Sequence, residues 1–262
     1  MEITLDFTKS AQENANDYFS KAKKARHKRE RAEQIIVDLE KRLSEVEAHI
    51  GEAKQEKVVK LVVEKKWYEK FHWFRTSTGL LAIGGRDAQQ NELLNSRYFE
   101  DPDMFFHADI FGASFVVLKD GKAAGREVKE EAAEFAACYS RAWDAGTTVN
   151  VYSLQREQVS KSTGKGSLGT GSFALKGERE WYRNMQLCLY LFVSTEGEAQ
   201  VLEAVPPSAY SKAMRRPAAE VRPGNLKKSD AAKKVAEILS YKGMDTIMQA
   251  LPNGMFSVKR IG

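Results

Sequence analysis

The chain has 262 residues, of which 42% are hydrophobic and 29% charged, so it can bury one sizeable core or two modest ones. Its formal net charge of +5 is small, but basic residues gather near both ends, as is typical of proteins that bind polyanions. Neither a signal peptide nor an apolar run long enough to span a membrane is found, and Cys138 and Cys188 lack CxxC spacing. We therefore expect reduced thiols, a cytoplasmic location and no membrane partner.

A long coiled-coil helix is predicted in the first segment, 1–66, because apolar residues follow a heptad repeat with neither Pro nor Gly before Gly51. Ser10 or Thr8 is expected to cap its start, with Glu13 as the capping-box partner of Ser10. The seam predicts a solvated spacer or a rod that pairs with a second copy or another helix. Its residues are Ala11, Ala15, Tyr18, Ala22, Ala25, Arg29, Ala32, Ile36, Leu39, Leu43, Val46 and Ile50.

Basic residues crowd one stretch of this helix, with Glu30 as the single acid among them. Like charges on neighbouring turns destabilise a helix, so an external polyanion is the expected counterion. This basic run consists of Lys21, Lys23, Lys24, Arg26, Lys28, Arg29 and Arg31. Beyond it, residues 51–66 are expected to continue as a shorter helix or a return arm.

The fold class is predicted to be α+β, with a mixed domain over residues 67–204 after the long helix. A turn signal between two short apolar runs favours a hairpin of 72–76 and 80–83. One apolar face runs through 127–144 and predicts a single helix that ends at Gly146. The other expected elements are a helix over 87–99 and strands over 104–107, 113–118, 147–154, 171–175, 187–193 and 199–204.

Residues 205–262 are predicted to be a linker followed by a small basic module. Pro206-Pro207 opens the linker, and the Arg-Pro-Gly-Asn run at 222–225 closes it. The sequence leaves open whether this module stands apart or packs onto the preceding domain. Its expected elements are a basic helix over 228–239, a second helix over 244–251 and a terminal strand near 255–259.

Polar side chains cluster directly after a double-glycine turn, at the start of the helix expected over 87–99. Because a helix N-terminus attracts anions, Arg86 is a candidate phosphate ligand, and Gln89 and Asn91 could read base edges or ribose hydroxyls. The alternative is structural, since Asp87 as N-cap with Gln90 at the third helical position makes a capping box. The residues alone leave both interpretations open.

His107 and Asp109 are expected on one face of a strand, either as a base-contacting pair or as a structural hydrogen-bond pair. The histidines show no metal-ligand spacing and no nucleophile elbow occurs, so we expect no metal, no cofactor and no catalytic residue. The GxGxxG at 164–169 lacks the flanking strand and helix of a dinucleotide site. It is either a flexible glycine loop or an amide-rich loop that approaches phosphates with Lys161 and Lys165.

Taken together, these motifs resemble the NFACT family, namely its RNA-binding domain NFACT-R and the coiled-coil segment before it. The resemblance is carried by KKWYEKF (65–71), GGRDAQQNE (84–92), HAD (107–109), GAS (112–114), AWD (142–144), QVSK (158–161) and GTGSF (169–173). It extends to the basic helix and to the C-terminal tail. The RNA-binding residues that we assign are Arg86, Asp87, Gln89, Asn91, His107, Asp109, Ser114, Gln158, Ser160, Lys161, Lys165, Thr170 and Ser172.

The resemblance implies a non-enzymatic RNA-binding adaptor of ribosome-associated quality control, which binds ribosomal RNA of the large ribosomal subunit, or tRNA, at stalled complexes. The N-terminal and helix–hairpin–helix domains of complete members have no counterpart here, so we expect a fragment or a short stand-alone version. Its exposed seam would favour self-association as a homodimer or with a helical partner. Two alternatives stay open: a nucleic-acid-binding accessory subunit of an RNA-modifying enzyme, and a general DNA or RNA polyanion binder.

Overall fold

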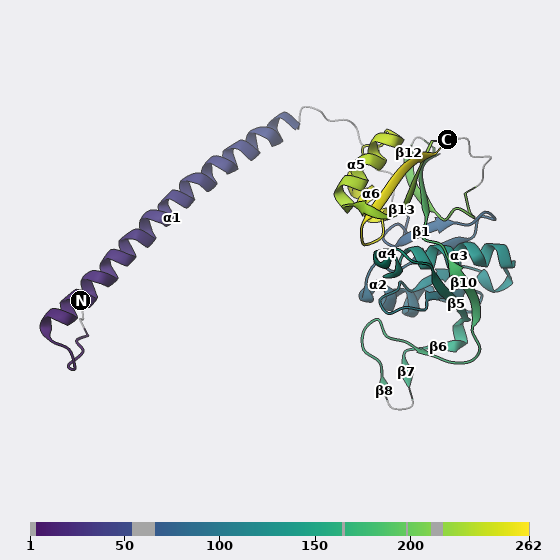
Figure 1. Ribbon diagram of the computed structural model, residues 1–262, viewed down its shortest axis with the longest axis horizontal. Helices are drawn as coiled ribbons and strands as arrows, with labels where there is room; N and C mark the ends of the chain where they lie inside the picture. The colour runs from purple at the N-terminus through teal and green to yellow at the C-terminus, as the bar shows by residue number, and fades with distance from the viewer. Residues whose placement is uncertain (1–3, 54–65, 164–165, 198, 211–216, 262) are drawn as a thin grey trace. The chain divides into compact units, whose positions relative to one another are not determined.

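The computed structural model describes residues 4–53, 66–163, 166–197, 199–210 and 217–261 (Figure 1). The chain divides into two units, Met1–Val62 and Val63–Gly262, each described here by itself. Of the arm expected over 51–66, residues 54–65 lie outside the described part. Within the described residues, no helix has both the length and the apolar character that a membrane crossing requires.

The first unit is built on helix α1 (Ala11–Ala53). Its predicted capping box is confirmed, because the Glu13 N–H donates to Ser10 Oγ (3.3 Å) and the Ser10 N–H donates to Glu13 Oε2 (2.8 Å). The segment before the helix folds back onto its first turns, where the Asn14 side chain bonds both the N–H (2.9 Å) and the carbonyl (3.0 Å) of Asp6. Polar bonds thus fix the start of the helix.

The larger sheet of the second unit has the strand order β1-β2-β4-β3-β5-β10, and all neighbouring strands run antiparallel. The predicted hairpin at its edge is confirmed, and so are strands near 104–107, 113–118 and 147–154. Strand β10 was not predicted, because aromatic and charged residues alternate along it without a clean apolar face. The strands are β1 (His72–Arg75), β2 (Leu81–Gly84), β3 (Met104–Ala108), β4 (Val116–Leu118), β5 (Val149–Gln155) and β10 (Glu180–Met185).

Both faces of this sheet are covered. Helix α3 (Arg126–Cys138) packs along β3, β4, β5 and β10 on one face. The other face buries a second core, in which Phe105 and Phe115 lie with ring centroids 4.3 Å apart. Helix α2 (Ala88–Leu93) and the π-helical turn η1 (Leu94–Tyr98) pack onto this second core. The helix predicted over 87–99 is confirmed in this form.

The single helix predicted over 127–144 is wrong in one respect, because α3 ends at Cys138 and a short helix α4 (Ala142–Ala145) follows. Between them, Ser140 Oγ donates to the carbonyl three residues earlier (2.7 Å) and accepts from the N–H two residues later (3.2 Å). Such local side-chain bonds compete with the helical ladder. The predicted stop is confirmed, since Gly146 ends α4 with φ 65°.

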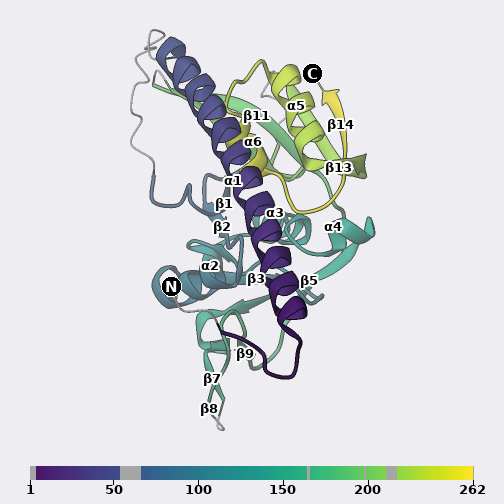
Figure 2. The ribbon, with the colours of Figure 1, turned by 90° about the vertical axis from the view of Figure 1, so that its left-hand side faces the viewer.

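An arm projects from the larger sheet between β5 and β10 (Figures 1 and 2). It begins at the 3-10 turn η3 (Arg156–Gln158) and consists of antiparallel pairs of two-residue strands. The strand predicted over 171–175 is therefore shorter than expected. The pairs are β6 (Val159–Ser160) with β9 (Ala174–Leu175) and β7 (Ser162–Thr163) with β8 (Gly166–Ser167).

A smaller antiparallel sheet has the order β12-β11-β13-β14, and α5 packs against β13 and β14 (Figure 2). The linker expected to close at 222–225 is wrong, because these residues lie inside strand β13. Strands from both sides of residue 205 thus share one sheet. The predicted helices and terminal strand are confirmed. The elements are β11 (Leu189–Glu196), β12 (Ala199–Val205), β13 (Ala218–Leu226), α5 (Lys228–Leu239), α6 (Met244–Ala250) and β14 (Phe256–Ile261).

Candidate functional site

An open hollow of about 770 Å³, which we call the main hollow, lies in the second unit beside the start of α2 and the end of β3. It collects residues that the sequence spreads over nearly 90 positions, from Arg86 to Ser172. Five of the assigned residues that the structure describes do not line it, namely Gln89, Asp109, Gln158, Ser160 and Lys161. The predicted RNA-binding residues on its wall are Arg86, Asp87, Asn91, His107, Ser114, Thr170 and Ser172.

Asp87 caps α2 as the capping interpretation predicts, but the return bond of Gln90 goes to Arg86 and not to the N-cap residue. Asp87 is the N-cap and accepts from the Gln90 N–H (2.8 Å), while Gln90 Oε1 accepts in return from the N–H of Arg86 (3.1 Å). Asn91 Oδ1 accepts from the backbone N–H of Phe115 (3.0 Å). A Cβ on Gly85 would lie only 2.1 Å from that oxygen, so glycine is required there. These polar groups build the wall of the hollow.

Ser114 ties the same wall together from the other side. Its buried hydroxyl donates to the carbonyl of Gly85 (2.6 Å). Together with the bond between Asn91 and Phe115, this contact joins the loop before α2 to the loop before β4. Buried hydrogen bonds of this kind rigidify a site when every member is satisfied.

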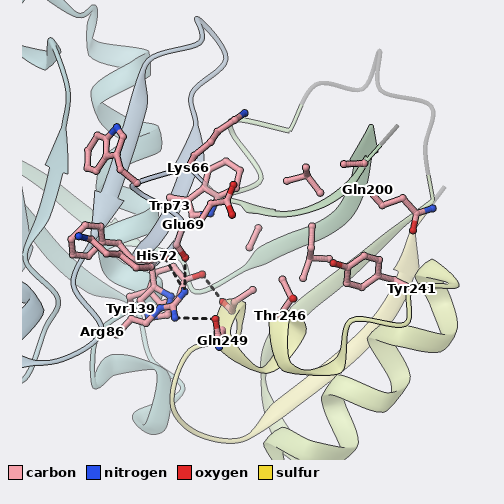
Figure 3. Close-up of a pocket in the computed structure, with 18 residues that line it drawn as sticks. Lys66, Glu69, His72, Trp73, Arg86, Tyr139, Gln200, Tyr241, Thr246 and Gln249 are labelled. Atoms are coloured by element: carbon pink, nitrogen blue, oxygen red, sulfur yellow. Dashed lines mark hydrogen bonds between the residues drawn. The ribbon is translucent and has the colours of Figure 1, made fainter. Parts of the chain in front are cut away.

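Arg86 is bonded within the protein and lies between this hollow and a second one of about 700 Å³ (Figure 3). Its guanidinium donates to the carbonyls of Phe71 (2.9 Å) and Glu69 (3.3 Å) and to Gln249 Oε1 (3.2 Å). Burial lowers the pKa of Arg86 from its usual value. The predicted contact of Arg86 with phosphate stays a prediction, whereas its hydrogen bonds join the turn before β1 to α6.

His72 lies beside Arg86 in the second hollow, with its ring stacked on that of Tyr139 at 3.9 Å between centroids (Figure 3). Burial, and then the charge of Arg86, hold the pKa of His72 well below its usual value. The neutral ring can therefore pack on the tyrosine. Tyr139 in turn donates its hydroxyl to the carbonyl of Ala250 (2.7 Å), linking the end of α3 to the end of α6.

His107 lines the main hollow as a neutral side chain. Burial lowers its pKa to about 4, outweighing the backbone bond with Ala108 and the charge of Asp109, which act in the opposite direction. Its Nδ1 lies 3.3 Å from the hydroxyl of Tyr152. A neutral imidazole offers one donor and one acceptor, which suits recognition of a base edge or a ribose hydroxyl. Asp109 is exposed, just beyond the end of β3.

The base of the arm is held by residues that the sequence assigned to RNA. Lys161 Nζ donates to the Glu92 carboxylate and to the carbonyls of Gly169 (2.8 Å) and Ser172 (3.3 Å). Because Glu92 also accepts from the Gly171 N–H (3.2 Å), the loop at 169–172 is fixed against α2. This arrangement brings Thr170 and Ser172 to the hollow.

The remaining predicted residues of the arm lie farther from the hollow. Gln158 donates to the carbonyls of Lys176 (3.2 Å) and Glu178 (2.9 Å), and Ser160 Oγ donates to the carbonyl of Ser162 (2.9 Å). These bonds hold the two sides of the arm together. Lys165 lies outside the described residues.

Sequence reasoning missed one exposed pair on the rim. Phe111 is 86% exposed and lines the hollow, and the Arg141 guanidinium lies 5.7 Å from the centre of its ring. The only available signal was an aromatic residue beside a glycine in a loop that follows a strand. A guanidinium over an exposed ring is a surface that nucleic-acid bases can stack on.

The basic run of α1 is exposed along its whole length. Within the described residues, His27 pairs with Glu30 (3.3 Å) and Arg29 with Glu33 (3.4 Å). The cations that make no ion pair with any described residue are Lys21, Lys23, Lys24, Arg26, Lys28 and Arg31. The seam residues of α1 as far as Leu43 are also exposed. In the described part of the chain, no group of three or more His, Cys, Asp or Glu residues is placed to hold a metal ion.

Residues 70–177 match the family described as the NFACT protein RNA binding domain. This range contains every residue of the main hollow except Asn253. The chain belongs to the NFACT family. The domain supplies β1 to β5, α2, α3 and the arm, so the hollow is a feature of the matched domain.

Two curated relatives of this NFACT chain carry the match beyond the domain. The archaeal Rqc2 homolog aRqcH of Methanocaldococcus jannaschii is 37% identical over 201 residues, which are 74% of this chain and 30% of that protein. The ribosome quality control complex subunit NEMF homolog of Drosophila melanogaster is 34% identical over 209 residues, 77% of this chain and 21% of that protein. The chain spans less than a third of the length of either relative.

A solved structure, the C-terminal part of the fibronectin/fibrinogen-binding protein from Streptococcus suis, is also similar. It is 25% identical in sequence, with 50% of each chain covered and a TM-score of 0.39.

Proposed function

We propose that this chain is an RNA-binding adaptor of ribosome-associated quality control, which binds the large ribosomal subunit or tRNA at stalled complexes in the cytoplasm and catalyses no reaction. The observation that carries the proposal is the main hollow inside the matched RNA-binding domain, whose wall presents hydroxyls, a neutral imidazole and an arginine on an aromatic ring. Such groups recognise ribose, base edges and exposed bases. A role in ribosome quality control is supported by the Drosophila relative, which is named as a ribosome quality control complex subunit, and by the archaeal relative, which is named as an Rqc2 homolog.

The basic run supplies the electrostatic part of the proposed binding. Its unpaired cations, among them Lys23, Lys24 and Arg26, are exposed on α1 and free to neutralise phosphates. Each phosphate contact releases counterions, so binding through about six phosphates gives a slope near −5 in log affinity against log salt. A smaller slope with strong RNA preference would assign most of the affinity to the hollow instead.

Co-sedimentation with purified large ribosomal subunits tests the proposal. The Lys23→Glu/Lys24→Glu/Arg26→Glu variant is expected to lose most of its binding at moderate salt, because three favourable phosphate contacts become repulsive. The matched control reverses three exposed lysines on and just after α5, Lys233→Glu/Lys234→Glu/Lys242→Glu, and is expected to sediment like the unmodified chain.

Each result discriminates among functions. Equal loss in the two triple variants identifies a general polyanion binder. Binding to isolated tRNA with none to the subunit favours an accessory subunit of an RNA-modifying enzyme. If the unmodified chain binds neither the subunit nor tRNA at low salt, the proposed function is wrong.

A further inference from the structure

A row of aromatic and guanidinium groups crosses the larger sheet from the main hollow to its edge. Trp181 on β10 lies directly opposite Tyr152 on β5, and Tyr152 lies opposite His107 on β3. Residues that oppose each other across strands project from the same face. The ring centroids are 5.4 Å apart for Trp181 and Tyr152 and 5.7 Å for Tyr152 and His107. The hollow thus continues outwards as an aromatic row.

Two arginines extend this row at the sheet edge. The Arg179 guanidinium lies 4.5 Å from the centre of the Tyr152 ring and 5.8 Å from that of Trp181, and the Arg183 guanidinium lies 4.5 Å from Trp181. We call Tyr152, Arg179, Trp181 and Arg183 the stacking row. Contact with the rings restrains both guanidinium groups, so a ligand that binds them has less side-chain motion to order.

The backbone of β10 contributes to this arrangement. Pairing with β5 shifts register after Tyr182, so that Arg183 and Asn184 together oppose Asn150. Asn184 adopts φ 54°, and its N–H donates to Asn150 Oδ1 (3.0 Å). A bulge of this kind redirects side chains at a sheet edge, which here keeps Arg183 over the indole of Trp181.

The charge of the stacking row is not neutralised by the protein. Arg179 and Arg183 are exposed and make no ion pair with any residue that the structure describes. The neighbouring Glu180 projects to the opposite face, where Lys129 lies 3.9 Å away. Next to the larger effect of burial, the charge of Asp109 acts to raise the pKa of both Tyr152 and His107. Arg179 and Arg183 therefore present exposed positive charge beside aromatic rings, which suits a ligand that is both anionic and aromatic.

We propose that the stacking row binds unpaired RNA, with bases stacked on the guanidinium planes and on Trp181, and guides the strand towards His107 and the hollow. This inference rests on the proposed RNA-binding function and adds its substrate class. Single-stranded nucleic acid offers both a base face and a phosphate to each arginine. The bases of an A-form duplex are already stacked on one another, so a duplex would meet only the charges.

Fluorescence anisotropy with labelled RNA tests the substrate class. The probes are a single strand of roughly 12 nucleotides, within the site sizes of single-strand binders, and the same strand annealed to its complement. The Arg179→Lys/Arg183→Lys variant keeps the charge and removes the planar stacking surface. It is expected to bind the single strand about tenfold more weakly, the loss of about one stacked base, and the duplex as before.

The matched control is Arg75→Lys on β1, at the opposite edge of the sheet, where the guanidinium lies 5.7 Å from the ring of Tyr68. This control is expected to leave both affinities unchanged. Trp181→Ala should reproduce the single-strand loss and Trp181→Phe should restore most of it. Because Trp181 is partly buried, circular dichroism must show that both Trp181 variants are folded. Arg179 and Arg183 are exposed, so the Arg179→Lys/Arg183→Lys variant tests the stacking row independently of the Trp181 variants.

The outcomes separate this inference from the proposed function. If the unmodified chain binds the single strand and the Arg179→Lys/Arg183→Lys variant binds it equally well, the stacking row is overturned and RNA binding stands. An equal loss for single strand and duplex overturns it too, because charge alone would then explain the effect. If the unmodified chain binds neither probe, the stacking row is overturned, whereas the proposed function is decided separately by the experiment with large subunits and tRNA.

Discussion

His107 is neutral in the folded chain because burial outweighs the attraction of a nearby carboxylate. A charged imidazole would lose more solvation free energy on burial than it gains from attraction to Asp109. The pKa of His107 therefore falls from 6.5 to about 4. This protonation state decides what the residue can do. A neutral ring bonded to Tyr152 presents a directional donor or acceptor to a ligand, whereas an imidazolium would only add charge.

The same balance makes stability depend on pH. The unfolded chain protonates His107 below pH 6.5, but the folded chain does so only near pH 4. The free energy of unfolding should therefore fall as pH drops through this window, by about 2 kcal/mol between pH 7 and about 4.5. His107→Gln, which can still accept from Tyr152, should flatten the curve by that amount in urea titrations.

His72 also contributes to the pH dependence of stability, and the comparison of the two proteins removes its contribution. Its lowered pKa acts in the same direction, but it is present in both proteins, so the difference between the two curves belongs to His107 alone. Parallel curves for the unmodified chain and His107→Gln would show that the pKa of His107 is the same in the folded and the unfolded chain, contrary to the effect of its burial.

At the residue scale, seven of the residues assigned from the sequence line the main hollow, but the sequence did not show what each side chain contacts. Short motifs placed Asn91, His107 and Ser114 correctly on one wall. Their partners are backbone groups from distant segments, such as the Phe115 N–H, and no local pattern reveals these. Lys161 shows the limit clearly, since a lysine in a glycine-rich loop predicts an anion outside the protein. The structure gives it Glu92, a partner 69 positions away.

At the element scale, β13 shows why a Pro-Gly pair misleads. Pro223 and Gly224 predict a loop, yet they lie in a strand at a register shift between Pro223 and Leu226. Proline is tolerated at such irregular positions because no ladder donor is needed there. Glycine is required for a different reason, since a Cβ on Gly224 would lie 2.5 Å from the Ser257 nitrogen of β14. Local sequence carries no sign of that approach.

Replacing this glycine should therefore destabilise the small sheet. Gly224→Ala forces β13 and β14 apart and is expected to cost about 2 kcal/mol, as overpacking typically does. In a unit of this size the midpoint of thermal unfolding should fall by about 5 °C. Gly169→Ala is the control, because no atom lies within 4 Å of the added Cβ. Equal midpoints for the two variants would contradict the close approach of the strands.

Helix α1 was easier to predict than strand β10. Helix α1 combines clear periodicity with a start signal at Ser10, whereas the break between α3 and α4 depends on one serine. Strand β10 has no clean apolar face because one side carries the stacking row and the other packs Tyr182 beneath Arg126. Functional surfaces thus obscure the periodicity on which sequence prediction depends.

At the scale of the whole molecule, the second unit is one compact unit that extends beyond the matched domain. Strand β13 pairs with β11, and three side chains of the matched domain bond the C-terminal part. These are Arg86 to Gln249 (3.2 Å), Tyr139 to the Ala250 carbonyl (2.7 Å) and Trp143 to the Met255 carbonyl (3.1 Å). The last two donors are on buried residues.

Truncation separates this arrangement from independent modules. A chain of residues 63–262 should unfold in one cooperative transition, because the unit keeps both sheets. A chain of residues 63–205 should bind a hydrophobic dye and lack such a transition, since it exposes the edge of β11 and the apolar core beneath α5 and α6. The truncation also removes the acceptors of Tyr139 and Trp143, and each donor left unpaired lowers the free energy of unfolding by about 1–3 kcal/mol if it stays buried. A sharp calorimetric transition for residues 63–205 would show instead that the C-terminal strands and helices are an appendage.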